Sequence, residues 1–351
     1  FNSTTTTSQT VGSLEYTFYN EAKLARVTDT TSTSLSGTLE IPSVVSSGGN
    51  SYKVYSIGSS AFYDCSYLNL ITIPEGIVEI GNYAFYECRD LTSITLPSTL
   101  TTIGSYAFSG CTGLSSITIP EKVASIGSSA FRYCKLSEFR GQGNSYYTID
   151  DNRALIVDGG ATLLAYAVAN LKTSYLIPEG VTEIGAYTFY NHRSLTSITI
   201  PEGVTSIGTW AFFDCSNLTS INLPSTLTEI NSSAFSGCYA LAIVYNNSGL
   251  NITEGAISYE RVAYYAKEVV ANGQQAQGRI EEIGDVNYYF NEKTGEFIAL
   301  APSISRDSIT QISIVDEAKE INLYAFEDCV NLTSITATLI TPPVRMRRYY
   351  R

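Results

Sequence analysis

The chain has 351 residues, of which 44% are hydrophobic and 15% are charged. It carries 33 acidic and 21 basic side chains, so its formal net charge at pH 7 is −12. Nucleic acids and anionic membrane surfaces both attract basic proteins, and this charge argues against either partner. No apolar stretch reaches the roughly 18–20 residues that a membrane-spanning helix needs, so we expect no membrane insertion of this segment.

Residues 1–56 are predicted to form a cap for the repeats that follow. The chain begins Phe1-Asn2 without a methionine or a signal peptide, and we interpret it as a mature chain whose targeting segment has been removed. Residues 15–28 alternate between apolar and polar side chains as a β-hairpin does. Ile41-Pro42 begins a repeat that a turn at residues 46–50 interrupts. A cap is expected because the first repeat would otherwise expose its apolar face.

A five-residue unit of Ala or Thr, then Phe, two variable residues and Cys or His, occurs eight times and marks repeats over residues 57–140 and 177–245. Its phenylalanines are spaced by 23 residues within two series, which are Phe62, Phe85, Phe108 and Phe131, and Phe189, Phe212 and Phe235. A constant period of this size indicates stacked repeats, so the functional question concerns a surface more than a catalytic pocket.

One period shows the predicted elements of each repeat. Ile94-Thr95-Leu96 alternates as a strand does, and Pro97 ends the strand because it has no backbone donor. A second short extended run covers residues 100–103, and Gly104 turns the chain. Residues 106–111 are too few for a regular helix and are predicted to form a single helical turn.

Two insertions and a terminal segment interrupt this period. Residues 141–176 are predicted to be a β-hairpin insertion, a small meander with turns near residues 151 and 159. Residues 246–313 are predicted to be an irregular insertion, with a short helix at 259–271 and a hairpin over 286–300. Phe326 follows Phe235 by 91 residues, one short of four periods, so we expect these segments to occupy rungs of the stack. Residues 314–351 contain a terminal repeat and an arginine-rich tail.

The recurring pattern Leu-x-x-Ile-x-Ile-Pro-x-x-Val-x-x-Ile-Gly-x-x-Ala-Phe-x-x-Cys resembles the leucine-rich repeats of the BspA type over most of residues 35–340. Those repeats occur in bacterial cell-surface and secreted proteins. The resemblance implies a right-handed leucine-rich-repeat solenoid, β-rich with short helical turns, a parallel concave sheet and hairpin insertions. It also implies adhesion or protein–protein recognition in place of a reaction. The arginine-rich C-terminal residues depart from the family pattern.

All seven cysteines occupy one position of the repeat. Adjacent rungs would hold them about 4.8 Å apart with parallel side-chain directions, whereas a disulfide needs Cβ atoms that converge to about 3.8 Å. We therefore predict a ladder of buried, reduced thiols that pack as small hydrophobic groups. The chain has no Cys-x-x-Cys spacing for zinc, and we expect no metal and no cofactor.

Candidate catalytic groups are few. His192 is the only histidine and occupies the cysteine position of its repeat, which favours a packed ladder residue over a general base. An acidic residue recurs on what we predict to be the second short strand, and the positions are Glu75, Glu79, Glu121, Glu179, Glu183, Glu202 and Glu229. These glutamates are interpreted as a solvated face, with a calcium site or a surface for a cationic partner as the alternative. We predict that the chain is not an enzyme.

Two groups of exposed side chains are candidates for a ligand surface. The strand threonines Thr95, Thr118 and Thr199 are predicted to point outward, which a solvated parallel sheet also explains. Aromatic residues recur at two positions of the predicted turn, which are Tyr83, Tyr106, Tyr187 and Trp210 at the first, and Tyr63, Tyr86, Tyr190 and Phe213 at the second. They either pack half-buried beside the core phenylalanines or form a strip that grips a protein or stacks on sugar rings.

These observations predict a non-catalytic binding scaffold that is secreted or displayed on the cell surface. Its expected partner is a protein or another surface macromolecule, such as host extracellular matrix. A carbohydrate-binding module for nutrient capture and a structural spacer are the alternatives. Site of ligand contact discriminates them, because a protein would cover a broad footprint, a glycan would follow a narrow aromatic strip, and a spacer would bind nothing.

Overall fold

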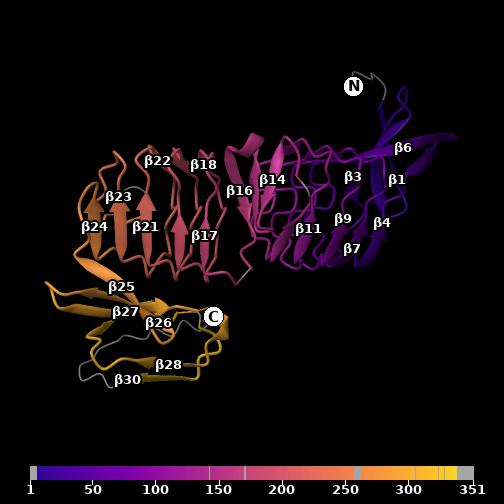
Figure 1. Ribbon diagram of the computed structural model, residues 1–351. Coiled ribbons are helices and arrows are strands. Elements are labelled where there is room, and N and C mark those ends of the chain that lie inside the picture. The colour runs from indigo at the N-terminus through magenta and orange to yellow at the C-terminus, as the bar shows by residue number, and fades with distance from the viewer. Residues whose placement is uncertain are drawn as a thin grey trace. The chain divides into compact units, whose positions relative to one another are not determined.

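The computed structural model describes residues 6–141, 143–169, 171–256, 262–304, 306–322, 324–327 and 329–337. The chain divides into two compact units, Phe1–Asn170 with Gly185–Thr188, and Leu171–Ile184 with Phe189–Arg351. Within the described residues both units are built of strands and turns, and the only helical elements are the short 3-10 helices η1 (Asp158–Gly160) and η3 (Arg306–Ser308). Each unit is a β-solenoid, as the period of 23 residues predicts (Figure 1).

The longer strand of each rung ends at or near the repeat's proline, and successive rungs pair in parallel. In the first unit these strands are β4 (Gly37–Glu40), β7 (Leu68–Thr72), β9 (Ser93–Thr95), β11 (Ser116–Thr118) and β13 (Glu138–Arg140). In the second unit they are β17 (Ser174–Leu176), β19 (Ser197–Thr199), β21 (Ser220–Leu223), β23 (Ile243–Asn246), β24 (Glu268–Ala271), β28 (Gln311–Ile314) and β30 (Ser334–Ala337). Figure 1 shows β21, β23 and β24 side by side.

A second, two-residue strand follows each proline turn. These short strands are β8 (Glu79–Ile80), β10 (Thr102–Ile103) and β12 (Ser125–Ile126) in the first unit, and β18 (Glu183–Ile184), β20 (Ser206–Ile207), β22 (Glu229–Ile230) and β29 (Glu320–Ile321) in the second. Thr102 pairs with Glu79 on one side and with Ser125 on the other, each exactly one repeat away in the register. The second extended run predicted at residues 100–103 is therefore confirmed.

The predicted helical turn at residues 106–111 is wrong, because the backbone donors are used in a different way. The N–H groups of Tyr106, Phe108 and Gly110 donate to carbonyls of the next rung at 3.1, 2.9 and 2.8 Å. The intervening N–H groups close β-turns within the rung, as Cys111 does to the carbonyl of Phe108 at 3.1 Å. An α-helix would need every N–H for bonds four residues back along its own chain. Bonding between rungs therefore replaces the helix.

Gly104 begins this series of turns, but a close approach of two backbones explains the glycine better than the turn does. A Cβ atom at residue 104 would lie 2.5 Å from the backbone nitrogen of Asn82 and from the carbonyl carbon of Gly81 in the preceding rung. No side chain fits at such a distance without moving the backbone. Gly81 and Gly127 meet the preceding rung in the same way, so the glycine column sets how closely the rungs stack.

The core is a pair of ladders that run along each unit. The buried rings of Phe62, Phe85 and Phe108 stack with centroids 5.1 and 5.3 Å apart. The cysteines form the second ladder, and all seven are buried free thiols, which confirms the predicted ladder. Each thiol of the regular rungs bonds to a carbonyl of the preceding rung, as the Cys111 Sγ does to the Phe85 oxygen at 3.1 Å. Burial raises the pKa of the Cys134 thiol to about 12, so these groups stay protonated.

Antiparallel strands cover the start of the first unit and fill its insertion. They are β1 (Thr6–Val11), β2 (Leu14–Tyr19), β3 (Leu24–Thr30), β5 (Val44–Ser47) and β6 (Asn50–Ile57), then β14 (Tyr147–Asp150), β15 (Ala154–Val157) and β16 (Thr162–Tyr166). The hairpin predicted at residues 15–28 is the β2–β3 pair, and the predicted meander is β14–β15–β16. β6 pairs in parallel with β3 and β8, so the N-terminal strands continue directly into the stack.

The helix predicted over residues 259–271 is wrong where the structure describes it. Residues 259–261 lie outside the described part, residues 262–263 form a turn, and Glu268–Ala271 is the strand β24. Two adjacent β-branched valines favour extended backbone, and pairing with β23 supplies the hydrogen bonds that a helix would have made internally. Three antiparallel strands follow, β25 (Gly278–Ile283), β26 (Val286–Asn291) and β27 (Glu296–Pro302), and the predicted hairpin at 286–300 is the β26–β27 pair.

One buried arginine secures this insertion within the second unit. Arg306 is 2% exposed, and its Nε donates to the Asn217 Oδ1 at 2.8 Å while its Nη2 donates to the carbonyl of Ser216 at 3.2 Å. Its third nitrogen, Nη1, donates to the carbonyl of Glu327. Neutral oxygen acceptors thus surround the guanidinium on several sides, which compensates for its removal from water.

Candidate functional site

The two aromatic positions lie on the outer side of the turns whose inner side holds the phenylalanine and cysteine ladders. In one rung Ala84, Phe85 and Cys88 are buried, whereas Tyr83 is 39% exposed and Tyr86 is half-buried. The first aromatic position directly precedes the alanine, and the second directly follows the phenylalanine. Both positions therefore repeat with the rungs and form rows on the surface.

In the first unit four tyrosines form what we call the aromatic strip, namely Tyr63, Tyr83, Tyr86 and Tyr106. Tyr63 stacks on Tyr86 with centroids 4.8 Å apart and planes inclined by 15°. Tyr83 stacks on Tyr106 at 4.9 Å and 2°, and an edge contact of 5.7 Å between Tyr83 and Tyr86 joins the two rows. The rung spacing alone brings these rings into contact, so the strip follows directly from the repeat.

An arginine continues the aromatic strip. Arg132 occupies the second aromatic position of its rung, and its guanidinium lies 5.9 Å from the ring centroid of Tyr106. The same guanidinium lies 4.1 Å from the ring of Tyr133 and 3.9 Å from that of Tyr187. A guanidinium is attracted to the negative face of an aromatic ring at such distances. Tyr187, predicted as a site residue, thus joins this surface through a cation and a 5.8 Å edge contact with Tyr133.

The second unit carries a smaller aromatic group. Tyr190 stacks on Phe213 at 5.0 Å and 5°, and Trp210 lies 5.5 Å from Phe213 and 6.3 Å from Tyr190. All three side chains are half-buried. The structure therefore places every predicted aromatic residue in a contact with its neighbouring rung, as half-buried packing requires, while leaving part of each side chain accessible.

The backbone at the first aromatic position is left-handed in every regular rung. Seven residues in this position have φ between 55° and 62°, namely Ser60, Tyr83, Tyr106, Ser129, Tyr187, Trp210 and Ser233. Bulky side chains seldom adopt this conformation, which costs on the order of 1 kcal/mol or more. Because serine occupies the same turn in three rungs, the turn does not require the aromatic side chains found in the other four.

The predicted threonines lie on a different face. Thr95, Thr118 and Thr199 are exposed, each on the longer strand of its rung. Thr95 pairs with Thr72 across the sheet, and Thr118 pairs with the exposed Arg140, whose guanidinium is bonded to Glu138. This face is polar and carries few large side chains, as a solvated sheet does.

Four of the seven periodic glutamates are not on the second short strand, and this part of the prediction is wrong. Glu75, Glu121, Glu179 and Glu202 lie in the turn after the proline. The Glu75 carboxylate accepts bonds from the backbone N–H and the hydroxyl of Ser98 in the next rung at 2.9 and 3.0 Å, and Glu202 meets Ser225 in the same way. These bonds hold the pKa of both carboxyls below the ordinary range. The glutamates therefore also connect successive rungs.

His192 is fully buried in the cysteine position that its sequence context indicates. Such a location supports its interpretation as a packed ladder residue, since a general base has to reach its substrate. In the described part of the chain no group of three or more His, Cys, Asp or Glu side chains is arranged to hold a metal ion. Among the same residues no helix has the length and apolarity that crossing a membrane would require.

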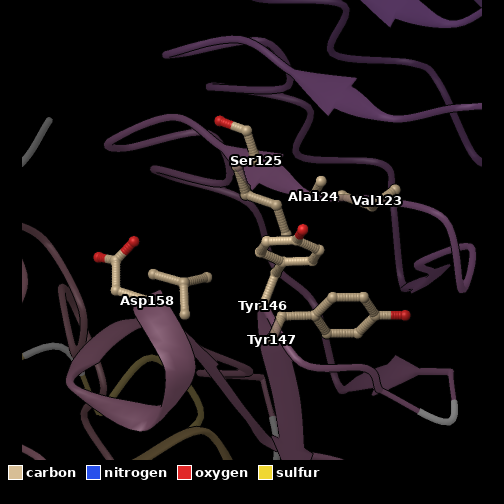
Figure 2. A pocket seen from close by; sticks show the side chains of 8 residues that line it. Val123, Ala124, Ser125, Tyr146, Tyr147 and Asp158 are labelled. Carbon is tan, nitrogen blue, oxygen red and sulfur yellow. The ribbon is translucent and has the colours of Figure 1, made fainter.

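The sequence gave no signal for one small pocket in the first unit. Its volume is about 80 Å³, and it is lined by residues of the short strand β12 and of the inserted meander, including Ser125, Ile126, Tyr146 and Asp158. Figure 2 shows Tyr146 and Asp158 entering the pocket from the meander and Val123–Ser125 from the rung beside it. The two sides are more than twenty residues apart in sequence, so only the folded insertion brings them together. The pocket has room for a few water molecules.

Comparison with known proteins identifies relatives of this fold. A family profile described as BspA type leucine rich repeat region matches in six copies over residues 43–153, 165–264 and 304–341, which is more than half of the chain. No curated protein sequence is detectably similar.

Solved bacterial structures share the fold at low identity. A leucine-rich repeat protein from Eubacterium ventriosum is 19% identical over 95% of this chain and 85% of its own, with a TM-score of 0.55. The pneumococcal vaccine antigen PcpA is 19% identical over 96% and 99%, with a TM-score of 0.51. A leucine rich cell surface protein from Faecalibacterium prausnitzii is 23% identical over 95% of both chains, with a TM-score of 0.48.

Proposed function

The chain belongs to the BspA-type leucine-rich-repeat family, and from this premise we propose that it is a non-catalytic scaffold that binds a protein partner outside the cell. Repeat scaffolds of this kind generally serve protein interaction. The family premise also supports a location on the cell surface or in the secreted fraction. Host extracellular matrix is the partner class that we propose to test first.

The observation that carries the proposal is the presence of aromatic side chains at a left-handed backbone position that serine fills equally well. Tyr83 and Tyr106 have φ of 56° and 57°, and Ser60 in the preceding rung has φ of 57°. Stability of the turn therefore does not explain the tyrosines. Residues held in a costly conformation at an exposed position are typical of functional surfaces, and Tyr, Trp and Arg carry most binding energy at protein interfaces.

The stacking geometry favours a protein over a glycan. Tyr83 and Tyr106 cover each other's ring faces at 4.9 Å, and Tyr63 and Tyr86 do so at 4.8 Å. A sugar ring needs an open aromatic face to stack on, whereas these rings present mainly their edges and hydroxyl groups. A row of phenolic hydroxyls beside aromatic edges suits hydrogen bonding and broad contact with a polypeptide.

The test is a binding screen of the whole chain against immobilised extracellular-matrix proteins and a polysaccharide panel at two salt concentrations. We expect saturable binding to a protein, which the Tyr106→Ala and Trp210→Ala replacements abolish while the chain remains folded. Tyr67→Ala is the matched control, since Tyr67 is 59% exposed and lies outside both aromatic groups.

Three results would contradict the proposal. Unchanged protein binding in the Tyr106→Ala and Trp210→Ala variants would remove the aromatic surface from the function. Binding to polysaccharides alone would favour nutrient capture, and binding to nothing in either panel would favour a structural spacer.

A further inference from the structure

The aromatic strip has one open end. Tyr86 covers one face of Tyr63, and Tyr106 covers one face of Tyr83. In the described residues no ring or cation is stacked on the opposite face of either end ring, and the preceding rung has Ser60 where Tyr83 would need a partner. Tyr63 and Tyr83 are accordingly 46% and 39% exposed.

The other end of the same surface shows what such a face accepts. There the guanidinium of Arg132 lies against the rings of Tyr133 and Tyr187 at 4.1 and 3.9 Å, and within 5.9 Å of Tyr106. Tyr106 and Tyr83 are stacked neighbours at the same position of the turn. One end of the strip is therefore closed by an arginine of the chain itself, and the other end presents the same ring type without one.

We infer that the open end of the strip binds an arginine or lysine side chain of the partner polypeptide, stacked on Tyr63 and Tyr83. The inference rests on the proposed protein-binding function and specifies which side chains of the partner are recognised. A cation over a ring face gains from the negative charge of that face, and an exposed, partly desolvated site strengthens the contact.

The charged groups around the open end complement a cation. Asp64 directly follows Tyr63 and is exposed, and it has no ion pair within the described part of the chain. The neighbouring Glu87 is bonded to Arg89 at 2.8 Å, and Asp90 is exposed beside them. An incoming guanidinium would thus meet an available carboxylate next to the ring. The net charge of −12 also attracts basic partners at a distance.

The test uses fluorescence anisotropy of a labelled, otherwise neutral Gly-Ser peptide that carries two arginines, titrated with the full-length chain. The same peptide with citrulline in place of arginine keeps the shape of the side chain and removes its charge. We expect binding of the arginine peptide to weaken about tenfold in the Tyr63→Leu, Tyr83→Leu double variant. Citrulline is expected to abolish binding.

Two further variants separate recognition from folding. Tyr67→Leu alters an equally exposed tyrosine outside the strip and is expected to leave peptide binding unchanged. Asp64→Asn is expected to weaken binding about threefold at low salt and less at high salt, because it removes the carboxylate and keeps the shape. Urea unfolding of all variants verifies that the comparison involves folded protein.

Three outcomes would overturn the inference. They are equal binding of the citrulline peptide, an equal loss in Tyr67→Leu, and displacement of the peptide from wild-type protein by soluble xylan but not by free arginine. If instead the arginine peptide fails to bind while the double variant still loses the protein found in the matrix screen, the proposed function stands and the inference falls. The two claims can therefore fail separately.

Discussion

The inner and outer ladders of the first unit have the same spacing and opposite roles. Inside the turns Phe62, Phe85 and Phe108 stack at 5.1 and 5.3 Å and are at most 1% exposed. Outside the same turns Tyr83 and Tyr106 stack at 4.9 Å, and Tyr83 is 39% exposed. Ring stacking follows from the rung spacing in both cases. Burial distinguishes them, so the inner ladder should determine stability and the outer ladder should determine binding.

The largest expected effect comes from breaking the inner ladder. Phe108→Ala removes a fully buried ring that contacts both neighbouring rungs, and we expect the free energy of unfolding to fall by about 3–5 kcal/mol. Urea unfolding followed by circular dichroism measures this loss. The control is Tyr106→Ser two residues earlier in the same turn. A loss of the same size in that variant would contradict the division between the ladders.

A second effect concerns the buried thiols of the inner ladder. Burial raises the pKa of Cys134 from an ordinary value of 9.0 to about 12, so the folded state retains the proton that the unfolded state loses. The resulting stability is complete below pH 9 and is lost as the pH rises from 9 towards 12. At pH 10 the expected loss of unfolding free energy is about 1 kcal/mol for each such thiol.

Urea midpoints at pH 8, 9 and 10 measure this loss, and Cys134→Ala is expected to reduce the slope. A thiol reagent should react with wild-type protein at pH 8 only when urea unfolds it. Rapid reaction of the cysteines in folded protein would show that the inner ladder is more accessible than its burial indicates.

The smallest expected effect on stability comes from the outer ladder. Tyr83→Ser reproduces the residue found at Ser60 and relieves a bulky side chain at positive φ. We expect the free energy of unfolding to change by less than about 1.5 kcal/mol, because the lost stacking and the relieved strain oppose each other. Partner binding should nevertheless weaken strongly. Urea unfolding and the matrix screen measure the two quantities on the same preparation.

Much of the fold was predictable because the repeat itself encodes it. The spacing of 23 residues, the Ile94-Thr95-Leu96 alternation and Pro97 together predict a strand that ends at the proline and pairs with its copies. The in-and-out pattern likewise predicts the phenylalanine and cysteine ladders. The helical turn at residues 106–111 and the helix at 259–271 were wrong, since local patterns do not reveal that a backbone donor bonds to the next rung.

The candidate site was predictable in part for the same reason. Positions of the repeat place Tyr83 above Tyr106 and Tyr63 above Tyr86, so the rows could be anticipated. The contact between Arg132 and Tyr187 could not, because an insertion separates these residues by 55 positions and destroys the period between them. The pocket between β12 and the meander depends on that same insertion.

The sequence by itself determined that this chain stacks repeats, which side chains enter the core and which recur on the surface. It could do so because each contact between rungs joins residues one period apart. The tertiary structure alone decided which ring faces are covered, which end of the strip is closed by Arg132 and how Arg306 is buried against Asn217. Those contacts cross insertions that follow no period, and their geometry depends on packing in three dimensions.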